Sequence, residues 1–279
     1  MLVPLAIAAV GLIGALLSLS LFPGNAEKYA TILQTEETDF ATDIQEVNYS
    51  EIPFIDRDSA MLLGNRTMGA MADYVSQYVI DDIYTQINYQ DSPVRVSPLN
   101  YADLFKWWSN KETGIPGYVI VNMSTQDTQI VRLDDPIYYS DSDPLFNNVD
   151  RHVQLKYPFY ILGEKSFEID DNGKPYWIYP VMDYKVGLFG GQTVSRIILC
   201  DANTGECQDI AIEDVPQWID RAYPAELLIE QYNWSGSLSG GWINSWLGQV
   251  VFVRLHQELM EILAITMLLK MTTCGYTVV

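Results

Sequence analysis

The feature that most constrains the fold is a segment that occurs twice in the chain. Residues 87–99 align without gaps on residues 169–181, which lie 82 positions further on. An Ile begins both copies, and each contains two prolines five residues apart with a β-branched residue at the same position between them. Because a proline cannot donate to a central ladder, we expect Pro98 and Pro180 to lie at strand ends.

A second matching pair of segments follows the first. Residues 119–127 match residues 198–206 at an offset of 79, so the two offsets differ by a loop change of three residues. Each copy therefore predicts a hairpin, a connector and a second hairpin. Asn172-Gly173 is a strong hairpin signal, and Asn203-Thr204-Gly205 suits a turn closed by a left-handed glycine. The alternative is that any two strands rich in Val, Ile and Thr look alike, but the matching prolines favour duplication.

Helices are expected before and inside these units. Asp56 or Asp58 can cap a helix whose spaced apolar residues indicate a core face, namely Met61, Leu62, Met68, Met71 and Val75. A second helix is expected over residues 101–109, and a third begins at Asp143-Pro144.

The fold class predicted from this order is α+β, with two repeated units that each combine a helix with antiparallel hairpins. We expect the first unit over residues 25–140 and the second over residues 141–235. A Gly/Ser/Trp-rich stretch and an atypical tail occupy residues 236–279.

An uncharged segment precedes the first unit. Residues 2–22 contain no charged side chain and would span roughly 31 Å as a helix, which matches the core of a bilayer. We predict a transmembrane helix over residues 1–24. The alternative is a cleaved signal peptide with Gly24-Asn25-Ala26 as its cleavage site, but the run is longer than a signal core and no basic residue precedes it.

The flanking charges do not fix an orientation, because the first basic residue is Lys28. The missing basic flank also suggests a true start upstream of Met1. Export of the following region is the simpler arrangement. We therefore expect a single-pass protein of the cell membrane whose bulk lies outside the cytoplasm.

The charge balance excludes one class of partner. The chain has 16 basic against 36 acidic residues and a formal net charge of -20, which argues against nucleic acid because phosphate binding needs clustered Lys and Arg. The expected partners are instead the membrane, through the N-terminal helix, and an envelope protein or peptide.

No pattern in the sequence predicts catalysis. The only histidines are His152 and His256, too far apart in sequence to suggest a metal site, and His152 is interpreted as structural. Phosphate-binding loops and nucleophile elbows are not found. We therefore expect a protein that is not an enzyme and name no catalytic, cofactor-binding or metal-binding residue.

Two acidic segments and one pair of thiols were weighed as minor sites. Residues 201–206 resemble the start of a calcium loop but lack its glycine and its final glutamate, so a hairpin turn is favoured. Asp141-Ser142-Asp143 could hold a divalent ion weakly, although a solvated loop with a helix cap is favoured. Cys200 and Cys207 flank the last expected turn, so a disulfide is possible, and the sequence leaves it open.

The amino-acid composition changes twice in the C-terminal part of the chain. The stretch from Trp234 to Trp246 is rich in Gly and Ser, which indicates either packing, the favoured interpretation, or a binding loop at the membrane interface. Residues 250–279 then contain no Asp and no Pro, unlike the preceding region. Our hypothesis is that a frameshift produced this tail.

Four motifs carry a resemblance to known proteins: residues 84–89, 115–118, 187–191 and 215–221. Through them the stretch from about Tyr29 to Gln249 resembles large membrane proteins of Gram-positive, chiefly clostridial, bacteria. In that group the β-rich region continues beyond the position of Gln249, which implies that this chain is truncated or frameshifted there.

Each repeat is also similar to the PepSY module, a small exported domain of a helix and hairpins. Residues 173–178 and 198–206 carry this likeness. It implies binding or restraint of envelope proteins without catalysis. The leading hypothesis is thus a non-enzymatic binding or regulatory module of the cell envelope, and the alternatives are an exported hydrolase with paired carboxylates and a structural stalk.

Overall fold

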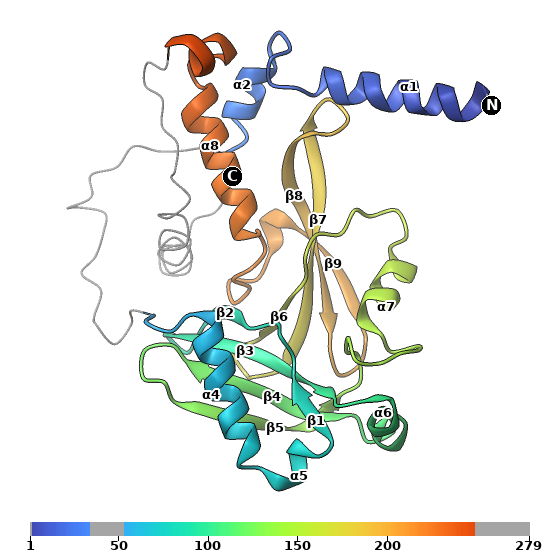
Figure 1. The fold of residues 1–279 in the computed structure, drawn as a ribbon, viewed down its shortest axis with the longest axis vertical. Coiled ribbons are helices and arrows are strands. Elements are labelled where there is room, and N and C mark those ends of the chain that lie inside the picture. Colours follow the sequence, from blue (N-terminus) through green and yellow to red (C-terminus); the bar gives the residue numbers. More distant parts are fainter. Residues whose placement is uncertain (1, 34–52, 249–279) are drawn as a thin grey trace. The chain divides into compact units, whose positions relative to one another are not determined.

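The computed structural model describes residues 2–33 and 53–248 (Figure 1). Within these ranges the chain forms two compact units. One consists of residues 53–181 and 196–222 and contains most of both repeats. The other consists of residues 2–33, 182–195 and 223–248. The suggested frameshift concerns residues 250–279, which lie outside the described ranges.

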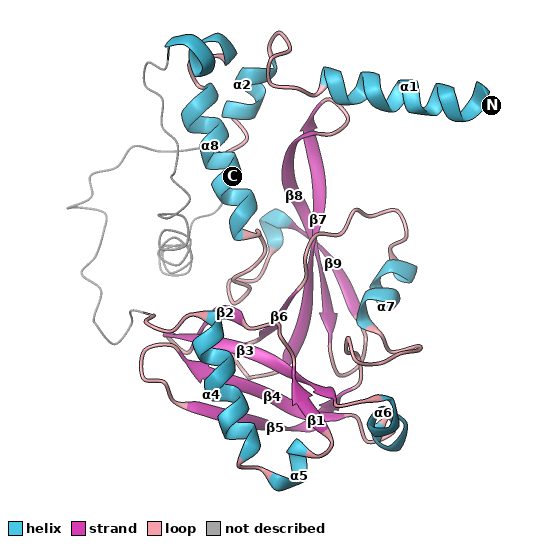
Figure 2. Ribbon diagram, in the orientation of Figure 1, coloured by secondary structure: helices cyan, strands magenta, loops and turns pink. Residues whose placement is uncertain are grey.

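The first repeat folds as a meander of strands with helices before and inside it (Figure 2). The order is α4 (Arg57–Gly69), α5 (Ala72–Val75), β1 (Tyr78–Ile80), β2 (Thr85–Tyr89), β3 (Ser92–Tyr101), α6 (Leu104–Asn110), β4 (Ile115–Asn122) and β5 (Thr128–Ile137). All neighbouring strands run antiparallel. Strands β1 and β2 pair with successive parts of β3, which is followed across the sheet by β4 and β5.

The second repeat folds in the same way. It comprises α7 (Val149–Lys156), β6 (Ser166–Ile169), β7 (Pro175–Val186), β8 (Gly190–Asp201), β9 (Cys207–Ala211) and the short 3-10 helix η2 (Ile212–Asp214). Its sheet has the order β6-β7-β8-β9, which matches β2-β3-β4-β5. The structure is therefore α+β with two antiparallel sheets. This part of the predicted fold class is confirmed, and its transmembrane helix is not.

The second hairpins of the two repeats agree down to single hydrogen bonds. Val121 pairs with Thr128 in the first, and Cys200 pairs with Cys207 in the second, 79 positions later. The side chain that opens each turn, Asn122 or Asp201, accepts the amides two and three residues further on at 2.8–3.1 Å. Similar composition alone does not explain this match, so the hairpins are two copies of one structure.

Positive backbone φ angles occur at equivalent places in these turns. Gln126 has φ 68° and Gly205, 79 positions later, has φ 73°. A left-handed residue is needed there to close the turn, and glycine adopts that conformation without the steric cost that glutamine carries.

The prolines of the repeat lie within strands, not at their ends as expected. Pro98 is inside β3, where the edge partner changes from β2 to β1, and Pro180 is inside β7. A proline has no backbone N–H to donate. At both positions the strand faces a gap in the pairing with its edge partners, so the missing N–H leaves no ladder hydrogen bond unformed. Their carbonyls accept equivalent amides, from Asp81 at 3.0 Å and from Gly163 at 2.8 Å.

Helix α4 begins as predicted and ends earlier. The Asp56 carboxylate accepts the Ser59 amide at 2.8 Å and caps the helix, which ends at Gly69. Its buried side contains Ala60, Gly64 and Met68. The expected core residues Leu62 and Val75 are exposed. Gly64 packs closely on the Tyr84 side chain. Met68 of the expected apolar stripe is buried, and Met61 and Met71 are partly buried against the core, so the stripe is confirmed in part.

The two later helices are also shorter than expected. Tyr101 belongs to β3, and Asp103 caps α6 by accepting the amides of Phe105 and Lys106 at 2.8 and 2.9 Å. Helix α7 begins after Asn148, which accepts the Arg151 amide at 3.1 Å. Residues 143–148 form turns before it, because Asp143 binds local amides and does not start a helix.

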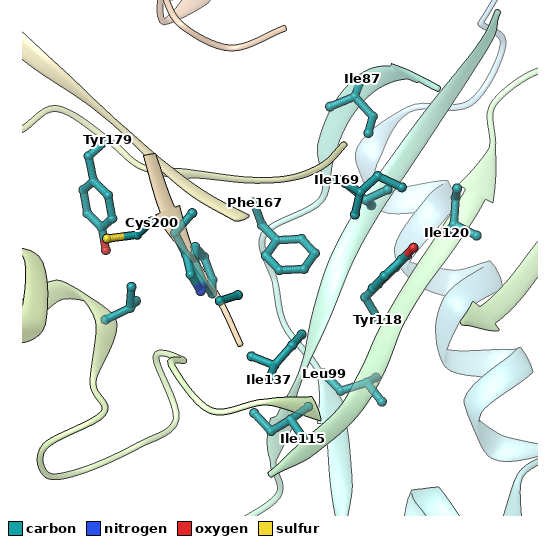
Figure 3. Packing of buried hydrophobic residues seen from close by; sticks show 14 of the residues in the cluster. Ile87, Leu99, Ile115, Tyr118, Ile120, Ile137, Phe167, Ile169, Tyr179 and Cys200 are labelled. Atoms are coloured by element: carbon teal, nitrogen blue, oxygen red, sulfur yellow. The ribbon is translucent and has the colours of Figure 1, made fainter. Parts of the chain in front are cut away.

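Both repeats contribute to one hydrophobic core. Rings from the two sheets meet there (Figure 3): Tyr118 lies 6.1 Å from Phe167, and Phe167 lies 5.1 Å from Trp177, between ring centroids. Polar atoms at its margin are paired, since the Tyr118 hydroxyl donates to the Gly173 carbonyl at 3.0 Å. The Trp177 indole donates to the Tyr139 carbonyl at 2.8 Å.

The other unit contains α1 (Leu2–Leu17), α2 (Asn25–Ala30), the hairpin end of β7 and β8, α8 (Ala225–Leu238) and the short helix η3 (Asn244–Gly248). The tyrosine ring of α2, Tyr29, packs edge-on against Trp234 of α8 at 4.8 Å. Part of the Gly/Ser/Trp-rich stretch is thus helical, since residues 234–238 continue α8.

The prediction of a transmembrane helix over residues 1–24 is wrong. Helix α1 has only 16 residues, and in the described ranges no helix combines the length and apolarity needed to cross a bilayer. It ends because polar side chains bind its last carbonyls: Ser18 Oγ donates to Gly14 O at 2.7 Å, and Asn25 Nδ2 donates to Leu17 O at 2.8 Å.

A disulfide joins Cys200 of β8 to Cys207 of β9. The two residues are direct cross-strand partners with a Cα–Cα distance of 4.1 Å, and both side chains are buried. The bond therefore closes the hairpin whose counterpart in the first repeat has Val121 and Thr128 at the same positions.

The difference between the two repeats at this pair of positions gives a direct test of what the disulfide contributes to stability. We expect the double variant Cys200→Val, Cys207→Thr to fold, because it restores the pair of the first repeat, and to lose about 2 kcal/mol of unfolding free energy. Urea denaturation of the full chain with and without dithiothreitol measures this. Reduction should lower the midpoint of the parent chain and leave the variant unchanged. Equal midpoints for the parent in both conditions would contradict a stabilising bond.

Candidate functional site

A cluster of ionisable side chains lies around the segment that joins the two repeats and the start of α7. Lys165 Nζ contacts Asp141 at 2.9 Å and Asp150 at 2.7 Å. The Tyr179 hydroxyl donates to the same Asp150 carboxylate at 2.6 Å. The Lys165 ammonium also lies 5.6 Å from the centroid of the Trp177 ring. We call Asp141, Asp150, Lys165 and Tyr179 the lysine cluster.

Electrostatics in the lysine cluster keep the lysine charged. Burial opposes the charge of Lys165, but hydrogen bonds to Asp150 and Asp141 outweigh it and raise its pKa. Burial raises the pKa of Asp141 in spite of its contact with Lys165, and burial followed by the bond to Asp150 raises that of Tyr179. A lysine nucleophile needs a lowered pKa, so this arrangement binds the segment in place and does not activate an amine.

A second buried acid lies on β6. Glu168 is fully buried, and its carboxylate accepts the amides of Asp220 and Arg221 at 2.9 and 3.0 Å and the Ser166 hydroxyl at 3.0 Å. Burial, together with the nearby Asp220 carboxylate, raises the pKa of Glu168 to about 8. Its oxygens are occupied by protein donors. The side chain therefore fixes residues 215–221, one of the four motifs of the sequence, onto β6.

The same segment is fixed to the first repeat. Asp220 Oδ2 accepts the backbone amide of Asn88 at 2.5 Å, and Trp218 packs on Tyr176 with centroids 5.2 Å apart. The position equivalent to Glu168 in the first repeat is Gln86, 82 residues earlier, which is also buried. The side-chain oxygen of Gln86 lies 3.4 Å from Arg95 Nη2.

Arg95 is the buried cation of this region. It donates to the Tyr84 carbonyl at 3.0 Å, while its Nε atom and the Tyr84 hydroxyl are buried without a hydrogen-bond partner. Burial, with a smaller contribution from Arg221, lowers the pKa of Arg95 to about 10, so the guanidinium remains protonated at neutral pH.

Apolar side chains, by contrast, are presented to solvent beside the lysine cluster. They come from α6 and from the turns before α7, and we call them the aromatic patch: Leu104, Phe105, Trp108, Leu145 and Phe146. Phe105 is 84% exposed and Phe146 is 87% exposed.

The two parts of the aromatic patch are held together by a buried bond. The Trp107 indole donates to Asp143 Oδ2 at 2.7 Å, and the other oxygen of Asp143 accepts the Leu145 amide at 2.7 Å. Arg151 donates to the carbonyls of Pro144 and Leu145. The exposed rings thus stand on a backbone that hydrogen bonds fix in place, as in a preorganised binding surface.

The minor sites weighed from the sequence take structural roles. In residues 141–143 the carboxylates bind Lys165 and Trp107, and no cluster in the described ranges could hold a metal ion. Asp201 opens the hairpin turn that was favoured over a calcium loop. His152 is half-buried, with Nε2 2.8 Å from the Gly205 carbonyl. Sequence reasoning missed Lys165 and Glu168, because neither stands in a motif.

Comparison of the chain with protein-family models, with curated proteins and with solved structures gave no match.

Loss of the central cation is the first test of the lysine cluster. We expect Lys165→Met to destabilise the full chain by about 2 kcal/mol, because Asp141 would remain half-buried with its charge unpaired. The matched control is Lys185→Met, since Lys185 forms an ion pair with Asp183 in which both side chains are largely exposed. It should cost less than about 1 kcal/mol. Equal losses in urea denaturation would contradict the assignment.

Glu168 predicts a pH dependence of stability. Between the ordinary carboxyl value of 4.5 and about 8, the folded chain holds a proton at Glu168 that the unfolded chain has released. Its contribution therefore makes the folded state less stable as pH rises through this window. We expect Glu168→Gln to flatten the slope of unfolding free energy between pH 5 and 8. Superimposable slopes for parent and variant would show that Glu168 titrates normally.

Proposed function

We propose that the chain is a non-enzymatic binding module of the cell envelope that holds a protein partner on the aromatic patch. The observation that carries this proposal is the contrast between the two kinds of side chain. The ionisable side chains of the lysine cluster bind one another, and Glu168 binds backbone amides, so none of them is open to a ligand. The rings of Phe105, Trp108 and Phe146, in contrast, are exposed on a fixed backbone. Fixed, exposed aromatic side chains are the usual energetic centres of protein interfaces.

The charge around the patch defines the chemistry of the partner. Lys106 and Lys111 belong to or follow α6, and Lys111 Nζ lies 3.9 Å from the centroid of the Trp108 ring. The chain as a whole carries a net charge of -20. Asp103 and Glu112 flank the same helix, so the charge beside the rings is mixed. A partner with an apolar pocket for the rings and an acidic residue opposite Lys111 would complement this surface.

Two observations support a location outside the cytoplasm. The Cys200–Cys207 disulfide is typical of oxidising compartments, because cytosolic thiols are kept reduced. Helix α1 contains no charged residue and its side chains are exposed, which suits contact with membrane lipid. The resemblance to PepSY modules, which implies binding of envelope proteins, agrees with this proposal.

The alternatives have less support. A hydrolase with paired carboxylates would need space for substrate between the acids, yet in the lysine cluster the Lys165 ammonium contacts both Asp141 and Asp150. Addition of a partner strand to β5 is disfavoured because Asp134, Asp135 and Pro136 lie along that edge, and such residues protect edge strands from pairing.

Site-specific photocrosslinking in the native host tests the proposal. With p-benzoylphenylalanine at Phe105, we expect one discrete crosslinked protein. The matched control is the same residue at Phe159, which is 95% exposed but outside the patch. The purified partner should then bind the Trp108→Ser variant at least about tenfold more weakly than the parent chain.

Two results would overturn the proposal. One is the same set of products from Phe105 and Phe159, which would indicate random collision. The other is a partner whose affinity is unchanged by Trp108→Ser.

A further inference from the structure

The turn between β7 and β8 contains one of the four sequence motifs, residues 187–191, and has an unusual composition. Hairpin turns are normally polar, but Leu188 and Phe189 occupy this one and are 59% and 55% exposed. Gly187 and Gly191 adopt positive φ angles of 62° and 64° on either side. We call Leu188 and Phe189 the hairpin tip.

The hairpin tip is joined to the end of α1 (Figure 1). The Ser18 Oγ atom accepts the amides of Leu188 and Phe189 at 3.1 Å each, and it donates to the Gly14 carbonyl at 2.7 Å. Ser18 itself is 4% exposed. The Tyr29 hydroxyl donates to the Ser18 carbonyl at 2.8 Å, so this polar junction is closed from a third side.

Two glycines make this close approach possible. A Cβ atom at Gly14 would meet the Leu188 side chain, and one at Gly187 would meet Ser18. The glycines of the motif therefore serve the contact between α1 and the hairpin tip, which places the two exposed apolar elements on one continuous surface.

That surface lacks charge along its whole length. Residues 2–22 and residues 186–195 contain no Asp, Glu, Lys or Arg, in a chain with 52 such residues, 16 basic and 36 acidic. The large apolar side chains of α1 are 45–71% exposed and occupy more than half of the helix circumference: Val3, Leu5, Ile7, Val10, Leu12, Ile13, Leu16 and Leu17. The remaining side carries the small residues Pro4, Ala8, Gly11 and Ala15, so no side of the helix is polar.

The distribution of apolar residues around α1 indicates what kind of surface or solvent covers this helix. A groove on a protein would cover one face of α1 and leave the other faces in water, and a helix lying at the membrane surface keeps a polar face. An uncharged helix that is apolar on all sides is instead suited to a hydrocarbon phase. We infer that the hairpin tip enters the acyl region of a lipid leaflet beside α1, as a second membrane-binding element. This inference rests on the membrane contact proposed for α1.

Spin labelling of the full chain in phosphatidylcholine proteoliposomes tests this inference. In a Cys274→Ser background, with the native disulfide intact, a nitroxide is attached at Phe189→Cys. The matched control is Asn172→Cys, an exposed position in the turn between β6 and β7. We expect vesicles to make the label at position 189 more accessible to oxygen than to a water-soluble nickel chelate, and to leave the label at 172 unchanged. Leu188→Cys repeats the measurement should the first variant fail to fold.

The outcomes separate the inference from the proposed function. If the chain floats with vesicles while the label at 189 stays accessible to nickel, the hairpin tip does not enter lipid, although the contact of α1 with the membrane stands. If the chain does not float at all, both fail. A third outcome is spin–spin broadening in the absence of vesicles. If this broadening disappears when unlabelled chain is added, a second copy of the chain covers the hairpin tip, which also overturns the inference.

An independent measurement uses partition instead of a label. We expect the double variant Leu188→Ser, Phe189→Ser to reduce vesicle partition about tenfold, because two half-exposed apolar side chains would no longer leave water. Leu62→Ser, at an exposed position of α4, should have no effect. An unchanged partition for the double variant would contradict a role of the tip in lipid.

Discussion

The shared core of the two repeats is the constraint on which the larger unit depends. A two-stranded hairpin is at best marginally stable in water, and each repeat has one sheet whose apolar face needs a cover. The rings of Tyr118, Phe167 and Trp177 come from both sheets and pack in sequence within one core. The sheet of the second repeat thus covers the apolar face of the first.

The two copies have kept their hairpins and changed the connectors between them. In the first repeat α6 joins the inner strands, and in the second a tight turn joins longer strands at the same place. Both connectors expose apolar side chains: Phe105 and Trp108 on α6, Leu188 and Phe189 in the turn. The connectors are the parts in which the two repeats differ most, and they carry the exposed apolar side chains for which we propose binding roles.

Charged groups inside the larger unit mainly hold segments without regular structure. Glu168 fixes residues 215–221 through two backbone amides, and Lys165 fixes Asp141 and Asp150 around the start of α7. A buried polar or charged group is costly unless it is hydrogen-bonded or paired, so each of these side chains specifies one position for the segment it binds. The cost is visible at Glu168, where burial raises the pKa to about 8.

The sequence by itself determined the elements that depend on local pattern. The repeat at offsets of 82 and 79 predicted two equivalent sets of hairpins, and the pair Asp56 and Asp58 predicted the start of α4, where Asp56 is the cap. These features follow from side chains acting on their own or neighbouring backbone. Where each element ends was predicted less well: Ser18 and Asn25 end α1 before it reaches the expected length, because their hydrogen bonds depend on how the chain folds back.

Only the tertiary structure decided which residues meet across long stretches of sequence. Lys165 with Asp141 and Asp150, Glu168 with the amides of Asp220 and Arg221, and Ser18 with the hairpin tip are all joined by the fold. None of these contacts has a spacing that a sequence could reveal, because hydrogen bonds between distant segments follow from the packing of sheets and leave no periodic pattern.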